Sequence, residues 1–265
     1  MVNSLSLAIL HRNQSQEITA LIGKVPAWIS EILIIDDDST ESELSALSKL
    51  EKSRPQVRVV SHALQNDFSA QRNFALSQAR GSWTLFLDAD ERPAGAFFDK
   101  LQRLLEKEVI EESGEGATAF SIIRHQVFLG RELHHGDGGA QRLIRLAKTK
   151  AGQGRWRRAV HEVWDFPTNQ VKHSDLTITH HNSANITEFI AKLNRYASLE
   201  PAVRPRQSLS TLLIQLLIYP KLKLCYNYLW KRGIIDGFPG LAHALCMSYY
   251  SAIVRIYLYE KHHTD

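Results

Sequence analysis

The chain of 265 residues contains only two cysteines, Cys225 and Cys246. Two cysteines cannot build a disulfide scaffold or a Cys-rich zinc module, and they favour a reducing compartment. Residues 1–10 lack a basic region followed by an apolar run, so no secretory signal is expected. The sequence has no internal repeat and no low-complexity tract. It has no helix-turn-helix, RRM or zinc-finger pattern, which argues against a nucleic-acid partner.

Acidic residues are scarce from Pro201 onward. This segment contains eight lysines and arginines but only three acids, Asp236, Glu260 and Asp265. The apolar run 209–219 is about half the ~20 residues that a bilayer requires. The run 241–259 is long enough, but Arg255 within it would cost about 2.5 kcal/mol or more near the bilayer centre. Basic and aromatic residues among apolar helices favour attachment in the plane of a membrane. The alternatives are a helical subdomain that packs on the protein and a transmembrane anchor.

The overall composition is that of an ordinary folded protein, with 44% apolar and 23% charged residues. Its length allows one large α/β domain with an appendage or two small domains. The net charge of +4 and the pI near 9.0 suit an anionic substrate, a phospholipid surface or nucleic acid, without choosing among them.

Apolar runs alternate with helical patterns over the first 110 residues. The sequence predicts strands at 5–10, 31–35, 57–60 and 83–87, and helices at 15–25, 39–50, 68–79 and 97–109. Such alternation predicts a doubly wound, mainly parallel sheet flanked by helices.

Two of the predicted strands end in acids. Asp36, Asp37 and Asp38 follow the strand at 31–35, while Asp88, Asp90 and Glu91 follow the strand at 83–87. Right-handed crossovers would bring both strand ends to one edge of the sheet, where open α/β folds bind ligands. The chain turns out of the strand at Asp88, so both aspartates there can reach one hard cation that also binds a nucleotide diphosphate.

Three segments of this half resemble a known family. Residues 34–40 (IIDDDST) look like its (V/I)DDGST segment, residues 66–73 (NDFSAQRN) like its NxGxxxARN helix start, and residues 81–91 (GSWTLFLDADE) like its strand ending in Asp-x-Asp. The family is the inverting family-2 glycosyltransferases. The resemblance covers roughly residues 4–110 and implies a GT-A fold, Rossmann-like, with a C-terminal helical extension.

The second half resembles one branch of this family, which builds the lipopolysaccharide core by adding β-linked glucose. The matching segments are 160–162 (VHE), 180–181 (HH), 192–196 (KLNRY) and 231–241 (KRGIIDGFPGL). The resemblance implies a GT-A domain over 1–200, with a nucleotide and metal half at 1–110 and an acceptor half at 111–200. Residues 201–265 would form a basic, apolar helical tail that associates with a membrane.

The resemblance assigns the donor site by position. Asp37 occupies the place that contacts the nucleotide base, with Asp36 beside it. Asp88 and Asp90 match the Asp-x-Asp pair, whose second member is usually the direct ligand of Mn²⁺ or Mg²⁺. Arg72 matches an arginine near the nucleotide, and a plain surface salt bridge is the alternative for this side chain.

Residues of the acceptor half follow in the same way. Glu162 occupies the place of the acidic base, and its alternative is a structural ion pair with Arg157 or Arg158. His161 would orient that base or touch the acceptor, unless it is a structural histidine. His180 is a candidate additional metal ligand, since imidazole tolerates Mn²⁺.

A basic aromatic segment, 155–158 (RWRR), is the candidate acceptor-binding surface. Arg157 and Arg158 could pair with acceptor phosphates, and Trp156 could stack on a sugar. Lys192 could bind phosphate, with a solvated helix face as the alternative.

The sequence therefore predicts an inverting, metal-dependent transfer of sugar, glucose in the resembled branch, to a lipid-linked saccharide such as the lipopolysaccharide inner core. UDP-glucose is the family's default donor. The implied location is the cytoplasmic face of a bacterial inner membrane, without insertion. Asp38, which replaces the family's usual glycine, and Arg92, which follows the Asp-x-Asp acids, leave the donor open. The alternatives are transfer to another glycan or a protein, and a non-catalytic basic scaffold.

Overall fold

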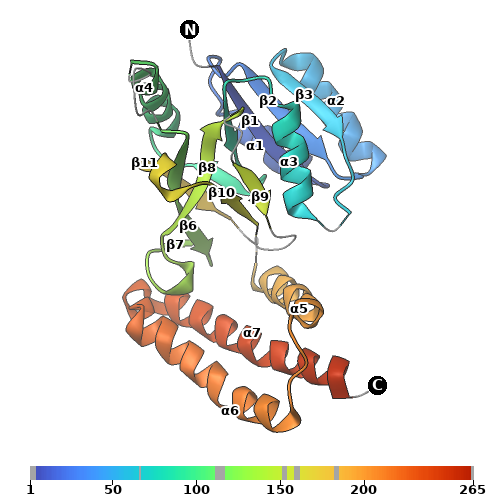
Figure 1. Ribbon diagram of the computed structural model, residues 1–265, viewed down its shortest axis with the longest axis vertical. Coiled ribbons are helices and arrows are strands. Elements are labelled where there is room, and N and C mark those ends of the chain that lie inside the picture. Colours follow the sequence, from blue (N-terminus) through green and yellow to red (C-terminus); the bar gives the residue numbers. More distant parts are fainter. Residues whose placement is uncertain are drawn as a thin grey trace. The chain divides into compact units, whose positions relative to one another are not determined.

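The structure of the chain is a computed structural model that describes residues 4–65, 67–110, 117–150, 154–157, 162–181 and 185–263 (Figure 1). The chain divides into two compact units. The first comprises Met1–Arg124 and Arg142–Ile178, and the second comprises His125–Gln141 and Thr179–Asp265.

The first unit is an α/β sheet whose elements follow the predicted alternation. They are β1 (Leu5–His11), α1 (Ser15–Ile22), β2 (Glu31–Asp36), α2 (Glu41–Ser53), β3 (Val57–Ser61), α3 (Phe68–Gln78), β4 (Trp83–Phe86), β5 (Glu91–Pro93), α4 (Phe97–Ile110), β6 (Ala119–Phe128), β8 (Gln141–Lys148), β9 (Arg155–Arg157), β10 (Val163–Asp165) and β11 (Val171–His180). The sheet order is β3-β2-β1-β4-β8-β6-β11-β5. The first four of these strands are parallel, as predicted, whereas β8 pairs antiparallel with β4.

Both faces of the parallel strands are buried, which explains why these segments are apolar without alternation. On β1, Leu5, Leu7 and Ile9 face a core that includes residues of α1, α2 and α4. Ala8 faces a second core, built with residues of α3 and of the β9–β10 hairpin. The sheet is therefore held from both sides, and its strand ends are the positions left for ligands.

Gly81 lies between α3 and β4 because the chain crosses β1 closely there. A Cβ atom at this position would lie 2.6 Å from the backbone nitrogen of Ser6. α3 itself ends at Gln78, three residues before this glycine. The glycine is thus required by the packing against β1 and not by the end of the helix.

The second unit is mainly helical. It contains the end of β6, β7 (Arg131–Leu133), a 3-10 turn (Gly136–Gly138), α5 (Ile186–Val203), α6 (Leu209–Cys225), a π-helical turn (Tyr226–Trp230), a second 3-10 turn (Gly233–Asp236) and α7 (Gly237–His263). α6 and α7 lie side by side (Figure 1). None of the described helices is long and apolar enough to span a bilayer.

Pro220 follows the apolar run 209–219 and does not interrupt the helix. α6 continues through Pro220 to Cys225. Proline removes the N–H that would bond to the carbonyl of residue 216. Its own carbonyl accepts a hydrogen bond from the Ser248 hydroxyl on α7 (2.7 Å). Packing against α7 therefore supports α6 at the position where local propensity would break it.

Candidate active site

Two acidic segments follow strands that flank β1. β1 pairs with β2 on one side and with β4 on the other, and all three run in the same direction. The N–H of Asp37 donates to the carbonyl of His11, at the end of β1 (2.8 Å). Asp37 after β2, and Asp88 and Asp90 after β4, therefore leave the sheet at the same edge, as the crossover argument predicts.

Asp37 is a buried carboxylate with a partner on each oxygen. Its Oδ1 accepts from the backbone N–H of Leu64 (2.7 Å), and its Oδ2 accepts from Nη1 of Arg12 (3.1 Å). Asp38 beside it has a φ of +45°. This left-handed conformation favours glycine, which gives a physical reason for the glycine that the family usually carries there.

Asp36 is 2% exposed and holds the turn after β2. Its Oδ2 accepts from the N–H of Ser39 (3.4 Å), and its Oδ1 lies 3.8 Å from Nε2 of His11. Burial keeps the pKa of His11 below its usual value, although the charges of Asp36 and Glu43 act in the opposite direction. Asp36 therefore contributes a buried negative charge next to a neutral imidazole.

Arg72 on α3 is an internal cation, with a side chain only 3% exposed. Its Nη2 donates to Oδ1 of Asp88 (2.7 Å), while its Nε and Nη2 donate to Oε1 of Glu162 (3.1 and 3.0 Å). The guanidinium carbon lies 4.7 Å from the ring centroid of Trp156. Arg72 thus joins the first acid of Asp-x-Asp to the candidate base, and the surface salt bridge considered for it is wrong.

Glu162 precedes β10 and is held by one oxygen. Both hydrogen bonds from Arg72 end on Oε1. Within the described residues no hydrogen bond ends on Oε2, so this oxygen can accept from a substrate hydroxyl. Arg157, one of the partners expected from the sequence, instead pairs with Asp165 (2.7 Å).

Arg145 on β8 is a second buried cation, which the sequence does not predict. Its Nη2 donates to Oδ2 of Asp88 (3.0 Å) and to Oε1 of Glu91 (3.1 Å). Burial would lower the pKa of this guanidinium, but the charges of Asp88, Glu91 and Glu162 hold it above its usual range. Glu91 is fully buried, lies 3.6 Å from Arg124, and accepts from the N–H of Asp88 through Oε2 (3.0 Å).

Trp156 belongs to the core, which corrects the expectation that it stacks on a sugar. It is 5% exposed and stacks on Trp164, with ring centroids 5.1 Å apart. Phe86 on β4 meets both indoles edge to face. The β9–β10 hairpin therefore turns its aromatic side chains inward under Arg72, and its arginines outward.

Asp90 is partly exposed, as is Asp88, while Ala89 between them is buried. Both aspartates follow the end of β4 and are partly open to solvent. Oxygen ligands of this kind fit Mn²⁺ or Mg²⁺. Each oxygen of Asp88 already bonds to a guanidinium.

The remaining sequence-predicted residues are distributed differently. Arg157 lies on β9 with its side chain 71% exposed. His180 ends β11, and Lys192 lies on α5, so both belong to the second unit. Arg158 and His161 lie outside the described residues.

Comparison with known proteins agrees with the fold. A mannosyltransferase from Pyrobaculum calidifontis, solved in complex with GDP-Man and Mn²⁺, superposes with a TM-score of 0.52 at 12% identity, over 97% of this chain and 87% of that one. The expected GT-A fold with a C-terminal helical segment is confirmed.

Sequence comparison identifies the family. The chain is 24% identical over 238 residues to the lipopolysaccharide core biosynthesis glycosyltransferase LpsC of Rhizobium meliloti (strain 1021), covering 88% of this chain and 84% of that protein. It is 31% identical over 98 residues to the putative teichuronic acid biosynthesis glycosyltransferase TuaG of Bacillus subtilis (strain 168), covering 37% of each. The family described as Glycosyl transferase family 2 matches residues 6–135. Residues 6–135 therefore belong to glycosyl transferase family 2, and the chain is a glycosyltransferase.

Proposed function

We propose that this glycosyltransferase inverts the anomeric centre of a nucleotide-sugar donor, requires a divalent ion, and acts on a lipid-linked saccharide such as the lipopolysaccharide inner core. Similarity to LpsC over 88% of the chain supports this acceptor class. UDP-glucose is the donor proposed from the resembled branch. Another glycan or a protein is the alternative acceptor.

The link from Glu162 through Arg72 to Asp88 carries the proposal. Inverting transfer needs a base for the acceptor hydroxyl and groups that control charge at the leaving diphosphate. One buried guanidinium bonds to a carboxylate of each kind. A shared, rigid cation sets the separation of the two groups, which is what such a reaction requires.

Glu162 would act as the base. The acceptor hydroxyl donates to Oε2, its proton moves to this oxygen as the hydroxyl oxygen bonds to C1, and the bond from C1 to the diphosphate breaks. Arg72 orients the carboxylate through Oε1. Asp36 and Asp37 would border the nucleotide at the end of β2.

Asp90, with Asp88 beside it, would hold Mn²⁺ or Mg²⁺. When bound, the ion would supply positive charge to the departing diphosphate. The Pyrobaculum mannosyltransferase of the same fold was solved with Mn²⁺ and a nucleotide sugar, which supports this choice. Arg72 and Arg145 hold the carboxylate of Asp88 in place.

We further propose that the C-terminal segment attaches to the cytoplasmic face of a bacterial inner membrane. Large apolar side chains are exposed along α6 and the turns after it: Leu209, Leu213, Ile214, Leu217, Ile218, Tyr219, Leu222, Tyr226, Leu229, Trp230, Ile234, Ile235 and Phe238. Exposed apolar patches of this extent mark interaction surfaces. Lys221 and Arg232 are exposed on the same segments and would favour anionic lipids.

Donor binding can be tested by thermal shift. UDP-glucose, UDP-GlcNAc and GDP-mannose are each added with Mn²⁺, and the matching sugar should raise Tm by about 5 °C or more at 100-fold saturation. Asp90→Ala should lose the Mn²⁺-dependent part of the shift. Asp175→Ala, at an exposed acid paired with Lys100, is the control and should retain it. An unchanged shift in Asp90→Ala would remove the metal assignment, and no shift with any nucleotide sugar would refute the donor class.

Membrane attachment is tested by co-sedimentation with phosphatidylglycerol vesicles. Leu217 and Trp230 are 65% and 80% exposed, and replacing both with serine should weaken vesicle binding about tenfold or more. Leu44→Ser, at an exposed leucine on α2, should bind as the unmodified chain does. Equal binding by the double variant would refute the attachment surface.

A further inference from the structure

The hairpin formed by β6 and β7 has two distinct faces. Its strands pair antiparallel, with Gln126 opposite Leu133 and Val127 opposite Glu132. Phe128 and Leu133 pack into an apolar cluster with residues of α5. Because side chains alternate along a strand, Glu132 lies on the other face, and continuing the register by one residue adds His125 and His134 to that face.

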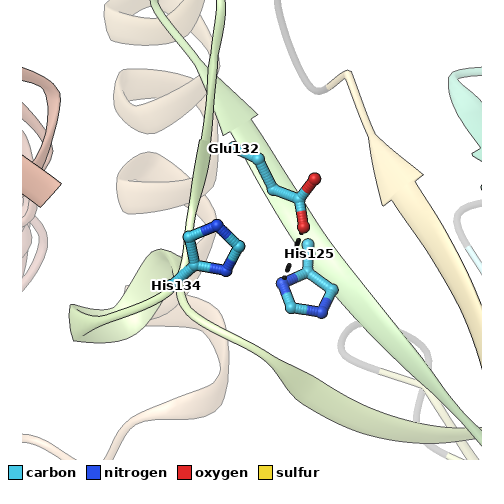
Figure 2. Close-up of side chains that lie close together, drawn as sticks. All are labelled: His125, Glu132 and His134. Atoms are coloured by element: carbon cyan, nitrogen blue, oxygen red, sulfur yellow. Dashed lines mark ion pairs between the residues drawn. The ribbon is translucent and has the colours of Figure 1, made fainter.

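Three side chains with metal-ligating atoms meet on this second face. Nδ1 of His125 lies 3.1 Å from Oε1 of Glu132. The imidazoles of His125 and His134 have centroids 5.4 Å apart and cross at 68°. One ligand atom from each of the three side chains lies within 4.8 Å of the others (Figure 2). Two strands thus bring together residues that are separated in the sequence.

His125 and Glu132 lie close together, but no hydrogen bond joins them. Nδ1 of His125 is buried and forms no hydrogen bond within the described residues, despite the carboxylate oxygen 3.1 Å away. The pair has the distance of an ion pair without the direction of a hydrogen bond. The ring of His134 forms no hydrogen bond in the described part of the chain either. Nitrogen lone pairs therefore remain for a ligand.

We propose that His125, Glu132 and His134 bind Zn²⁺. Two imidazole nitrogens and one carboxylate oxygen form a three-residue zinc set, with bonds of about 2.0–2.2 Å and a fourth position for water. Ligand atoms at the corners of a tetrahedron with these bond lengths lie about 3.4 Å apart. Side-chain movements of about 1 Å would bring the three ligand atoms to this separation. Mg²⁺ prefers oxygen ligands, which distinguishes this set from the acids after β4.

The ion would fix the segment that anchors the hairpin to the rest of the second unit. Directly after His134, the side chain and N–H of His135 bond to Asp236 (2.9 and 2.8 Å). Asp137 then pairs with Lys223 (2.5 Å) and Lys231 (2.8 Å). Burial opposes ionisation of Asp137, but the two lysines lower its pKa to about 2. Zinc bound beside this segment would therefore stabilise the position of the hairpin within the second unit.

The test is a Zn²⁺ titration of the purified full chain after chelator treatment and dialysis, with competition against a chromophoric chelator. One ion should bind with a Kd of 10 µM or tighter, an order-of-magnitude expectation for a partly exposed three-ligand site. His125→Gln, Glu132→Gln and His134→Gln should each weaken binding about 100-fold or more, since losing a ligand costs at least as much as losing its outer partner. Co²⁺ in place of zinc should give the intense visible absorption of a tetrahedral site in the unmodified chain only.

Two controls locate the ion. His173→Gln, at an exposed histidine on β11 whose Nδ1 lies 2.7 Å from the Ser121 hydroxyl, should bind zinc normally. Asp90→Ala should also retain the ion. Loss of binding in Asp90→Ala but not in the hairpin variants would assign the zinc to the acids after β4 and overturn the inference. Absence of binding tighter than 100 µM would overturn it as well.

Discussion

Replacing Glu162 with glutamine should slow sugar transfer by about 10²–10⁴-fold, the range expected when a general base is lost. The amide keeps the shape of the carboxylate, and its oxygen can still accept from Arg72. It cannot take up the proton of an acceptor hydroxyl. The donor contacts proposed at the ends of β2 and β4 are unchanged, so donor affinity should stay within about threefold of its original value.

Initial rates of transfer and thermal shift with donor separate the two effects. Asp165→Asn is the matched control: this acid lies on the same hairpin, 53% exposed and paired with Arg157, outside the network of Arg72. It should transfer at close to the original rate. Normal transfer by Glu162→Gln would assign the base elsewhere. Joint loss of transfer and donor binding would mean that Glu162 acts by supporting Arg72.

The sheet edge where β2 and β4 end in acids was predictable, because the sequence signals for it are local. An apolar run that ends in acids identifies a buried strand and the edge where it stops, and this pattern occurs before both Asp37 and Asp88. The connections between these strands are helical, so the handedness of crossovers places both ends together. Asp38 was recognised as a departure from the family, and its φ of +45° gives the physical reason.

The second half could not be derived in the same way, since its contacts join distant segments. Arg145 donates a hydrogen bond to Asp88, which lies 57 residues earlier in the chain, and β8 is antiparallel to β4. Nothing in the sequence distinguishes this arginine from Arg142, three residues earlier. Residues 155–158 are mostly basic, which suggests an exposed binding surface for all of them. Trp156 is nevertheless buried, because side chains alternate along β9 and the arginines on either side of it are exposed.

The proposed zinc site bears on how metal dependence should be interpreted. The low cysteine content argues against a Cys-rich zinc module, but it says nothing about a His₂Glu set assembled by strand register. A chelator would remove both the Mn²⁺ or Mg²⁺ ion proposed at Asp90 and the zinc ion proposed at His134. Activity lost to chelation should therefore be restored by Mn²⁺ in the His134→Gln variant and not in Asp90→Ala, if the ions have the separate roles proposed here.

Replacing Arg145 with methionine should destabilise the protein by about 3–5 kcal/mol, because it removes a buried cation that two carboxylates share. Glu91 is fully buried, and Asp88 loses the partner of its Oδ2. Methionine fills much of the space, so the loss reflects charge more than volume. For a chain of this size Tm should fall by about 10 °C. Arg142→Met is the control, since Arg142 is exposed and donates only to the carbonyl of Ser174 (2.9 Å). It should lower the stability by less than about 1 kcal/mol.

A double variant separates charge from packing. Glu91→Gln in the Arg145→Met background removes one of the two carboxylates that lose a cation, and it keeps an oxygen that can accept from the N–H of Asp88. The double variant should therefore be more stable than the sum of the single effects by about 1–3 kcal/mol. Additive losses, measured by urea unfolding, would mean that Arg145 contributes through packing alone. Because Arg145 also fixes Asp88, transfer should fall together with stability here, whereas Glu162→Gln should lose transfer alone.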